Sequence, residues 1–342
     1  MASVSDQSVA LSLDGRIFEL IVLPTEKCNF RCTYCYEDFA IGRMSEEVVL
    51  AVKRLIAARA PTLRWLTLSW FGGEPLLADS ILLDIAQHAH ELATRDGFVL
   101  SGGITTNGHR LTTKLVSDLW ELNHRMYQIT LDGYGAVHDA SRKLANGRAT
   151  FGRIWNNLLA IRDLGLELDI KLRVHVSAQN IASLPELLEH IDIEFAESKS
   201  FQIHFHRVSD LGGVGGKTVR ELSWNEYGKV LRELTKNTRT GYTSEHHLDG
   251  DGYICYAAKP NSLLVRADGR IGKCTVALND PRNHVGNLKA DGTIEFFDSR
   301  LRLWFEGFRE LDPRILGCPL PSLKSDPLHR ESSQRIEAEL IA

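Results

Sequence analysis

The sequence predicts an α/β fold: a partial (β/α)6 TIM-like barrel followed by a small C-terminal domain that contains a β-hairpin. Short apolar segments recur at intervals too wide for hairpins, and the segments between them have helical periodicity. A strong hairpin signal follows only after residue 241. We expect an N-terminal extension over 1–17, the barrel over 18–240, the small domain over 241–330 and a C-terminal tail over 331–342.

Apolar segments in the first two thirds of the chain predict buried strands. They cover 18–23, 66–71, 99–105, 126–131, 169–176 and 201–206. The spacing leaves room for a helix after each strand, which favours a parallel sheet with right-handed crossovers. These strands are fewer than the eight that close a TIM barrel, so we expect the barrel to be open.

Helical periodicity supports the intervening helices. Ser45 can cap a helix with Glu46 and Glu47 in its first turn and apolar residues on one face. Further helices are predicted over 81–92, 115–122, 154–164, 184–191 and 224–236. Beyond residue 241, Asp268-Gly269 between two short apolar segments predicts the hairpin.

Composition restricts the class of protein. The 342 residues carry a formal net charge of −4, which gives no field to gather nucleic acid or an anionic membrane. The N-terminus has no apolar core of a secretory signal, and no apolar run is long enough to span a bilayer. We therefore predict a cytoplasmic protein, whose six cysteines stay reduced and are better explained by metal binding than by disulfides.

Cys28, Cys32 and Cys35 form the densest group of cysteines and follow the first predicted strand. A tight loop can direct three thiolates to one point, and thiolates are the usual ligands of iron–sulfur clusters. Three protein ligands leave one iron of a four-iron cluster open for a bound molecule. The alternative is a structural zinc site in a non-catalytic binding module, which requires a fourth ligand.

The segment Leu23-Pro-Thr-Glu-Lys-Cys28-Asn-Phe-Arg-Cys32-Thr-Tyr-Cys35-Tyr36 resembles the signature of radical S-adenosylmethionine (SAM) enzymes. The resemblance implies a [4Fe–4S] cluster on the three cysteines and SAM bound to its open iron. It also implies an external electron donor of the flavodoxin or ferredoxin type. Reduction cleaves SAM in such enzymes and gives a 5′-deoxyadenosyl radical that abstracts hydrogen from the substrate.

The same resemblance assigns a SAM pocket at the carboxyl ends of the strands, where barrel loops face one cavity. The segment Gly72-Gly73-Glu74-Pro75 resembles the motif that contacts the SAM amino group, and Arg142 matches an arginine that binds the SAM carboxylate. A plain turn and a solvated arginine are the alternatives. The remaining candidates for cofactor binding are Tyr36, Thr106, Asn107, Thr130, Asp132 and Val176. His204 and His206 reach the same rim, as substrate ligands, proton shuttles or structural histidines.

Cys255, Cys274 and Cys318 lie around the predicted hairpin in a pattern that resembles the SPASM or twitch extension of radical SAM peptide maturases. The resemblance implies at most one auxiliary [4Fe–4S] cluster. Gly317-Cys318-Pro-Leu-Pro321 lacks the second cysteine of the family's Cys-Pro-x-Cys pair. The fourth site is then open, occupied by substrate, or held by Asp326 or His329. Three unrelated buried cysteines are the alternative.

The resemblance favours a maturase that crosslinks a ribosomally made precursor peptide with a leader. The sparse auxiliary cysteines and the Cys-Pro-Leu-Pro ending favour a carbon–carbon bond between an aromatic ring and a β-carbon, as in three-residue cyclophanes. Thioether formation, sulfatase maturation and small-molecule chemistry are alternatives. Sulfatase maturases place an aspartate where this chain has Thr275, and epimerases need a spare thiol. The sequence identifies no general base.

Overall fold

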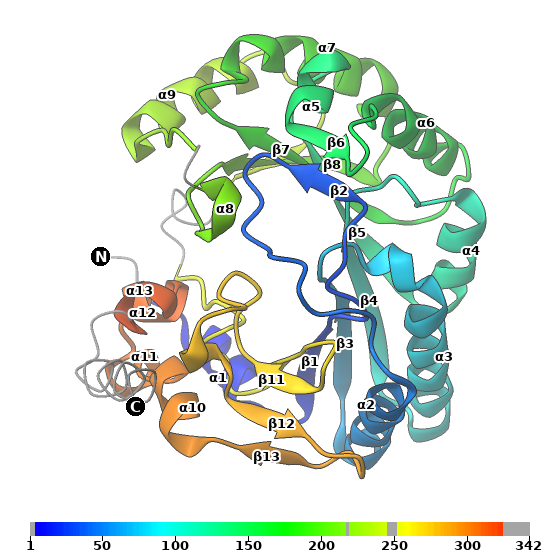
Figure 1. Cartoon of the computed structure of the whole chain (residues 1–342), viewed down its shortest axis with the longest axis vertical. Helices are drawn as coiled ribbons and strands as arrows, with labels where there is room; N and C mark the ends of the chain where they lie inside the picture. The colour runs from blue at the N-terminus through cyan, green and yellow to red at the C-terminus, as the bar shows by residue number, and fades with distance from the viewer. Residues whose placement is uncertain (1–3, 217–218, 245–251, 324–342) are drawn as a thin grey trace.

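The computed structural model describes residues 4–216, 219–244 and 252–323, and its main body is one curved sheet (Figure 1). Parallel strands form the centre of this sheet in the order β1 (Ile17–Val22), β3 (Trp65–Trp70), β4 (Val99–Thr106), β5 (His124–Leu131), β7 (Asp169–Val176) and β8 (Phe201–Arg207). The sheet bends into an arc with the helices on its outer side. The predicted partial (β/α)6 barrel is confirmed.

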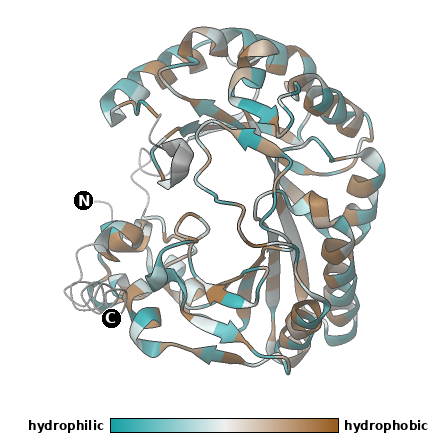
Figure 2. Ribbon diagram, in the orientation of Figure 1, coloured by the Kyte–Doolittle hydropathy of each residue, from teal (hydrophilic) through white to brown (hydrophobic). Residues whose placement is uncertain are grey.

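Helices cover the convex face, each between two strands of the parallel sheet. They are α2 (Glu46–Arg59), α3 (Asp79–Asp96), α4 (Thr113–Glu121), α6 (Phe151–Arg162), α7 (Leu184–Phe195) and α9 (Trp224–Thr235). The Ser45 side chain accepts a hydrogen bond from the Val48 amide, as the sequence predicts for an N-cap. Hydrophobic and hydrophilic residues alternate along these helices (Figure 2), which lets one side of each helix pack on the sheet.

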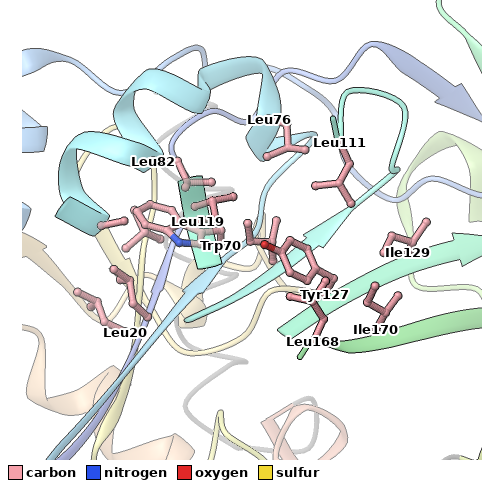
Figure 3. Close-up of a cluster of buried hydrophobic side chains, with 14 of the residues drawn as sticks. Leu20, Trp70, Leu76, Leu82, Leu111, Leu119, Tyr127, Ile129, Leu168 and Ile170 are labelled. Carbon is pink, nitrogen blue, oxygen red and sulfur yellow. The ribbon is translucent and has the colours of Figure 1, made fainter. Parts of the chain in front are cut away.

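The core lies between the convex face of the sheet and the helices. Figure 3 shows Trp70 and Tyr127 packed among leucine and isoleucine side chains that come from both layers. Along β7 the burial alternates, so Ile170, Leu172 and Val174 are fully buried while their neighbours face the concave side. Each buried side chain of this size contributes roughly 1.5–3 kcal/mol relative to exposure. This packing fixes the strand ends on which the concave face is built.

The C-terminal part continues the same sheet. Strand β10 (Ser262–Val265) pairs in parallel with β1, and β11 (Arg270–Gly272), β12 (Gly286–Leu288) and β13 (Ile294–Phe296) follow in antiparallel order. The turn between β10 and β11 holds Gly269 at a φ of 85°, so the predicted hairpin is confirmed. Strand β9 (Tyr242–Thr243) lies at the opposite edge, beside β8. The division of the chain at residue 240 stays a prediction.

Several short elements were not expected from the sequence. Helix α1 (Asp6–Leu13) lies within the N-terminal extension, and its Leu11 carbonyl accepts a hydrogen bond from the Asn261 side chain. Strand β2 (Phe30–Cys32) forms a separate antiparallel pair with β6 (Arg142–Leu144), which directly follows α5 (Ala136–Ser141). The others are η1 (Ala60–Thr62), η2 (Pro75–Ala78), η3 (Ile181–Ser183), α8 (Gly213–Gly216), η5 (Pro281–Asn283), α10 (Asp298–Trp304), α11 (Gly307–Glu310), α12 (Pro313–Gly317) and α13 (Leu320–Leu323).

Among the described helices, none has the length and apolar character that crossing a membrane requires. The predicted tail over 331–342 lies outside the described residues.

A buried ion pair joins the loop after β1 to the C-terminal hairpin. The Arg266 Nε atom lies 3.0 Å from Glu26 Oε1, and the Nη2 atom of the same guanidinium lies 2.5 Å from Glu26 Oε2. Both side chains are at most 5% exposed. The remaining guanidinium nitrogen donates to the Leu278 carbonyl. The pair thus links β10 to the segment that leads into the first cysteines.

Removal of one partner from this pair leaves the other charge buried without compensation. We expect Arg266→Leu to lower the free energy of unfolding by about 3–5 kcal/mol in urea denaturation. In contrast, Lys114→Ala, which removes the exposed pair with Asp118, should change it by less than about 0.5 kcal/mol. Equal effects of the two substitutions would contradict the assigned role of the buried pair.

His124 is fully buried at the start of β5, beside Gly102 of β4. A Cβ atom at Gly102 would lie 2.1 Å from the imidazole, so glycine makes room for the ring. The His124 Nδ1 atom lies 2.9 Å from the Leu122 carbonyl oxygen. Burial lowers the pKa of His124 to about 4, against a smaller opposite effect of that hydrogen bond.

The depressed pKa makes His124 a source of acid instability. The unfolded chain, with an ordinary pKa of about 6.5, binds this proton before the folded chain does. Stability from His124 is therefore full above pH 6.5 and declines as the pH falls toward 4. Between pH 8 and pH 5 we expect a loss of about 2 kcal/mol from this residue. For His124→Asn, urea denaturation at a series of pH values in this range should give a free energy of unfolding that depends less steeply on pH, by about one bound proton. An unchanged slope would assign the acid sensitivity to other groups.

Candidate functional site

The loop after β1 carries Cys28, Cys32 and Cys35 across the concave face, where all three thiols line one cavity. Burial is the main reason that the pKa of Cys28 rises to about 12 and that of Cys35 to about 11, and the neighbouring thiols add to it. Thiols with such pKa values stay protonated at neutral pH unless a cation compensates the sulfur charge. Bound iron supplies that charge, so a trio of soft sulfur donors in one cavity suits an iron–sulfur cluster.

The predicted glycines hold this loop in place through close backbone packing. A Cβ atom at Gly72 would lie 2.3 Å from the Thr25 carbonyl oxygen, and one at Gly73 would lie 2.5 Å from that of Lys27. The Glu74 amide also donates to the Lys27 carbonyl at 2.9 Å. Gly72 and Gly73 line the cavity as well. The end of β3 therefore supports the backbone immediately before Cys28.

The Glu74 carboxylate is fully buried and holds the ends of two strands together. It accepts hydrogen bonds from the Thr106 hydroxyl at 2.7 Å, the Asn107 amide at 2.7 Å and the Leu76 amide at 3.0 Å. Thr106 and Asn107 line the cavity, whereas Glu74 lies behind them. The Asn107 side chain donates to Asn29 in the cysteine loop at 2.9 Å. A contact of Glu74 with a ligand stays a prediction, and its observed partners belong to the protein.

Asp132 and Arg142 meet at the hydroxyl of Tyr34, which lies between Cys32 and Cys35 in the sequence. The Arg142 guanidinium donates to this hydroxyl at 2.7 Å, and the hydroxyl lies 3.1 Å from Asp132 Oδ1. Both charged side chains are more than nine-tenths buried. Within the described residues, Arg142 Nε is buried without a hydrogen-bond partner. A buried donor of this kind at a cavity wall is suited to an anionic ligand.

Arg142 reaches the cavity because of the small sheet formed by β2 and β6. In this sheet Arg142 is the register partner of Cys32, so the cation stands next to a thiol. Burial raises the pKa of Cys32, and the Arg142 charge opposes this rise. The guanidinium also lies 5.8 Å from the centre of the Phe30 ring.

The alternation of β7 decides which of its residues faces the cavity. Val176 is fully buried in the core cluster, and the cavity is lined instead by its neighbour His175 and by Arg173. The His175 Nδ1 atom lies 3.1 Å from the Tyr34 hydroxyl and 3.2 Å from Asp132 Oδ1. The sequence assigns no individual role to Tyr34 or Arg173. For the end of β7 it predicts that residues 174–177 close over the adenine of SAM, and Val176 rather than His175 is the candidate chosen from them. The missing signal was the strand register, which the buried sequence Ile170, Leu172, Val174 would have supplied.

The remaining candidates extend the cavity toward the neighbouring strands. Thr130 and His206 line it, from β5 and β8. Tyr36 lines it too, and its hydroxyl donates to the Thr275 carbonyl at 3.2 Å. Thr275 follows Cys274, so this hydrogen bond connects the first cysteine loop with the C-terminal one. His204 lies farther out, where its Nδ1 is 3.0 Å from the Thr243 hydroxyl.

The C-terminal cysteines lie in the segments around the hairpin. The Cys255 amide donates to the Leu316 carbonyl at 2.8 Å, and the Cys274 amide donates to the Asn283 side chain at 2.9 Å. Burial is the main reason that the pKa of Cys255 rises to about 12, with Cys274 and Cys318 near enough to add to it. Among the described residues, no three His, Cys, Asp or Glu side chains converge on a site for a single metal ion. Asp326 and His329 lie outside the described residues.

Comparisons with known sequences place this site in a family. Residues 22–191 match the sequence profile of the Radical SAM superfamily. The chain is 25% identical to a serine-type anaerobic sulfatase-maturating enzyme of Klebsiella aerogenes, over 93% of this chain and 82% of the relative. It is 29% identical to a GTP 3′,8-cyclase of Marinobacter nauticus, over 73% of this chain and 76% of the relative.

Solved structures share the fold. The structure of native anSMEcpe with bound AdoMet and Cp18Cys peptide aligns with a TM-score of 0.62 at 19% identity, over 84% of this chain and 83% of that one. Streptococcus suis SuiB bound to its precursor peptide SuiA aligns with a TM-score of 0.59 at 14% identity, over 88% of this chain and 67% of that one. The family profile implies a [4Fe–4S] cluster and SAM as cofactors. The chain belongs to the radical SAM superfamily, and it is a radical SAM enzyme.

Proposed function

We propose that the enzyme modifies a ribosomally made precursor peptide and forms an intramolecular crosslink in it. The observation that carries this proposal is a second cavity beside the one with the first cysteines. It opens between the cysteine loop and the C-terminal hairpin, and the two cavities share Tyr36, Glu37 and Leu211 in their walls. An extended peptide can follow such a joined space, whereas a compact small molecule needs one cavity alone.

The residues around the first cysteines suit the cofactors of the family. Cys28, Cys32 and Cys35 would hold the cluster, and the unpartnered Nε of Arg142 would bind the SAM carboxylate. Thr130 would contact the ribose side, Asp132 would act from behind the wall through Tyr34, and the backbone around Gly72 and Gly73 would complete the pocket. We assign Thr106, Asn107 and Tyr36 to the same pocket wall, with Glu74 acting through Thr106 and Asn107.

Bound in this pocket, the cluster and SAM supply the one-electron chemistry that yields a 5′-deoxyadenosyl radical. The protein's task is to hold the peptide so that one hydrogen, which we assign to a β-carbon, lies beside the reactive carbon. The cavity wall contributes aromatic and apolar surface from Phe30, Phe39 and Phe71, which excludes water from the radical.

We favour a carbon–carbon crosslink of the cyclophane type. Cys255, Cys274 and Cys318 would hold one auxiliary [4Fe–4S] cluster. After the β-carbon radical has added to the aromatic ring, the ring would lose one proton to solvent and one electron, and this cluster would be the acceptor of the electron. With both trios assigned to clusters, all six cysteines of the chain are used. This leaves no thiol to return a hydrogen atom, so epimerisation is disfavoured. Thioether formation remains the alternative among crosslinks, and an external flavodoxin- or ferredoxin-type donor would supply the electrons that cleave SAM.

A second candidate function is maturation of a sulfatase, which the similarity over 93% of the chain favours. The residue after Cys274 argues against it. Thr275 has a hydroxyl within 2.7 Å of the Tyr256 hydroxyl and carries no carboxylate there. A side chain without a carboxylate cannot act as the general base that the sequence resemblance places at this position.

Metal content tests the assignment of the two cysteine trios. We expect about eight irons and eight sulfides per chain in the unaltered enzyme, as two four-iron clusters require. Alanine at Cys255, Cys274 and Cys318 together should leave about four irons and retain SAM cleavage. Alanine at Cys28, Cys32 and Cys35 should also leave about four irons but abolish cleavage. Zinc without sulfide in the unaltered enzyme would contradict the proposal.

Product mass tests the proposed reaction. We expect the reduced enzyme, given SAM and the peptide encoded by the adjacent open reading frame, to yield a product two hydrogens lighter. Fragmentation should place the new bond between an aromatic ring and the β-carbon of a residue two positions on. A product of unchanged mass would mean epimerisation, and a bond to a peptide cysteine sulfur would mean a thioether.

A further inference from the structure

The Tyr34 hydroxyl is a meeting point for side chains from three separate parts of the barrel. It lies 2.7 Å from an Arg142 nitrogen on β6, 3.1 Å from Asp132 Oδ1 after β5 and 3.1 Å from His175 Nδ1 on β7. The ring of Tyr34 also meets the His175 ring edge-on, with 5.2 Å between the centroids. Tyr34 lines the cavity of the first cysteines. It also lines a third, larger cavity beyond the cysteine loop, which is distinct from the one beside the C-terminal hairpin.

The charges around this hydroxyl fix the direction of its hydrogen bonds. Burial opposes the charge on Asp132, but the hydrogen bond from His175 and the nearby cations hold its pKa well below its usual range. The carboxylate therefore accepts hydrogen bonds and donates none. Arg142 can only donate. The single hydroxyl hydrogen of Tyr34 is thus directed to Asp132, while a lone pair of its oxygen receives the Arg142 N–H.

His175 is drawn into the same arrangement. Burial lowers its pKa to about 4, so the ring is neutral at pH 7 and carries one N–H. Because Asp132 Oδ1, 3.2 Å away, accepts only, that hydrogen must be on Nδ1. The second Asp132 oxygen accepts from the Ser141 hydroxyl at 2.5 Å. Every oxygen of Asp132 is then engaged, and the carboxylate has a fixed orientation.

The orientation of the Arg142 side chain depends on the Tyr34 hydroxyl, whereas the Asp132 carboxylate has other hydrogen-bond donors as well. Its backbone is fixed by pairing with Cys32, and its guanidinium contacts the Phe30 ring. Within the described residues, the bond to the Tyr34 hydroxyl is the side-chain hydrogen bond recorded for Arg142, and its Nε has no partner. The hydroxyl therefore sets the rotation of the guanidinium and so the direction of the free N–H.

We propose that Tyr34 is a positioning residue of the SAM pocket, whose hydroxyl holds Arg142 so that its unpartnered Nε–H meets the carboxylate of SAM. An aromatic ring at position 34 packs against His175 with or without the hydroxyl. The hydroxyl, in contrast, connects the cysteine loop to the ends of β5, β6 and β7. The inference rests on the SAM site of the proposed function and is independent of the peptide.

The test compares Tyr34→Phe with Tyr127→Phe in anaerobically reconstituted enzyme. Tyr127 is a matched control, because it is buried in the core and its hydroxyl donates to the His124 carbonyl at 3.1 Å, away from the cavity. Iron and sulfide content should be the same in both variants and in the unaltered enzyme. Equilibrium dialysis then measures the dissociation constants of SAM and of 5′-methylthioadenosine, which lacks the aminocarboxylate.

We expect Tyr34→Phe to weaken SAM binding about tenfold, as loss of one charge-assisted hydrogen bond would. Binding of 5′-methylthioadenosine should change less than about twofold, since the missing contact is to the carboxylate. Tyr127→Phe should change neither constant. An equal loss for both ligands, or no loss for SAM, would overturn the inference. Failure of the unaltered enzyme to bind SAM would instead overturn the proposed SAM site, and this inference with it.

A double-mutant cycle separates positioning from general damage. If Tyr34 acts through Arg142, then adding Tyr34→Phe to an Arg142→Gln enzyme should change SAM affinity less than about twofold. Independent roles would give losses that multiply, and that result would also overturn the inference.

Discussion

The buried ion pair between Glu26 and Arg266 is the constraint on which the concave face depends. It joins the segment before the first cysteine to the turn of the C-terminal hairpin, between β10 and β11, with two nitrogen–oxygen contacts at 3.0 and 2.5 Å. Because burial of both charges costs free energy unless they stay paired, the pair tolerates little relative movement. Tyr36 adds a second connection through Thr275, next to Cys274. The ion pair and this hydrogen bond therefore connect the two groups of cysteines, although Cys35 and Cys255 lie far apart in the sequence.

Close backbone packing after β3 also holds the segment before Cys28 in place. Gly72 and Gly73, after the end of β3, pack closely against the carbonyl groups of Thr25 and Lys27. A Cβ atom at Gly72 would lie 2.3 Å from the Thr25 oxygen, and one at Gly73 would lie 2.5 Å from the Lys27 oxygen. The sequence motif suggests that these glycines approach a ligand. The structure shows an additional requirement for glycine that involves no ligand: the absence of side chains at these positions lets the chain before Cys28 lie close to the sheet. Glu74 then fastens the ends of β3 and β4 through Thr106 and Asn107.

The strands, the helices between them and the hairpin at Asp268-Gly269 were predictable because each has a local signal, either a period or a turn dipeptide. The first cysteines were predictable from their spacing and their place after a strand. The pairing of β10 with β1 and of β2 with β6 was not, because it joins residues far apart and leaves no periodic trace. Val176 illustrates the same limit: choosing the β7 residue that faces the cavity requires the strand register, and the register is set by packing across the sheet.

The wall of the cavity around the first cysteines holds a buried cation whose hydrogen-bonding capacity the described residues do not fully satisfy. Arg142 lines this cavity, and its Nε has no partner among the described residues. Elsewhere in the described barrel a buried carboxylate such as Glu74 has three donors. An unmet donor on a buried cation costs free energy in the folded state, so its presence is explained when a bound anion supplies the missing acceptor. Behind the wall of this cavity, Glu74 with its three donors therefore supports the strand ends, whereas Arg142 at the wall, held by the Tyr34 hydroxyl, offers a donor to a ligand.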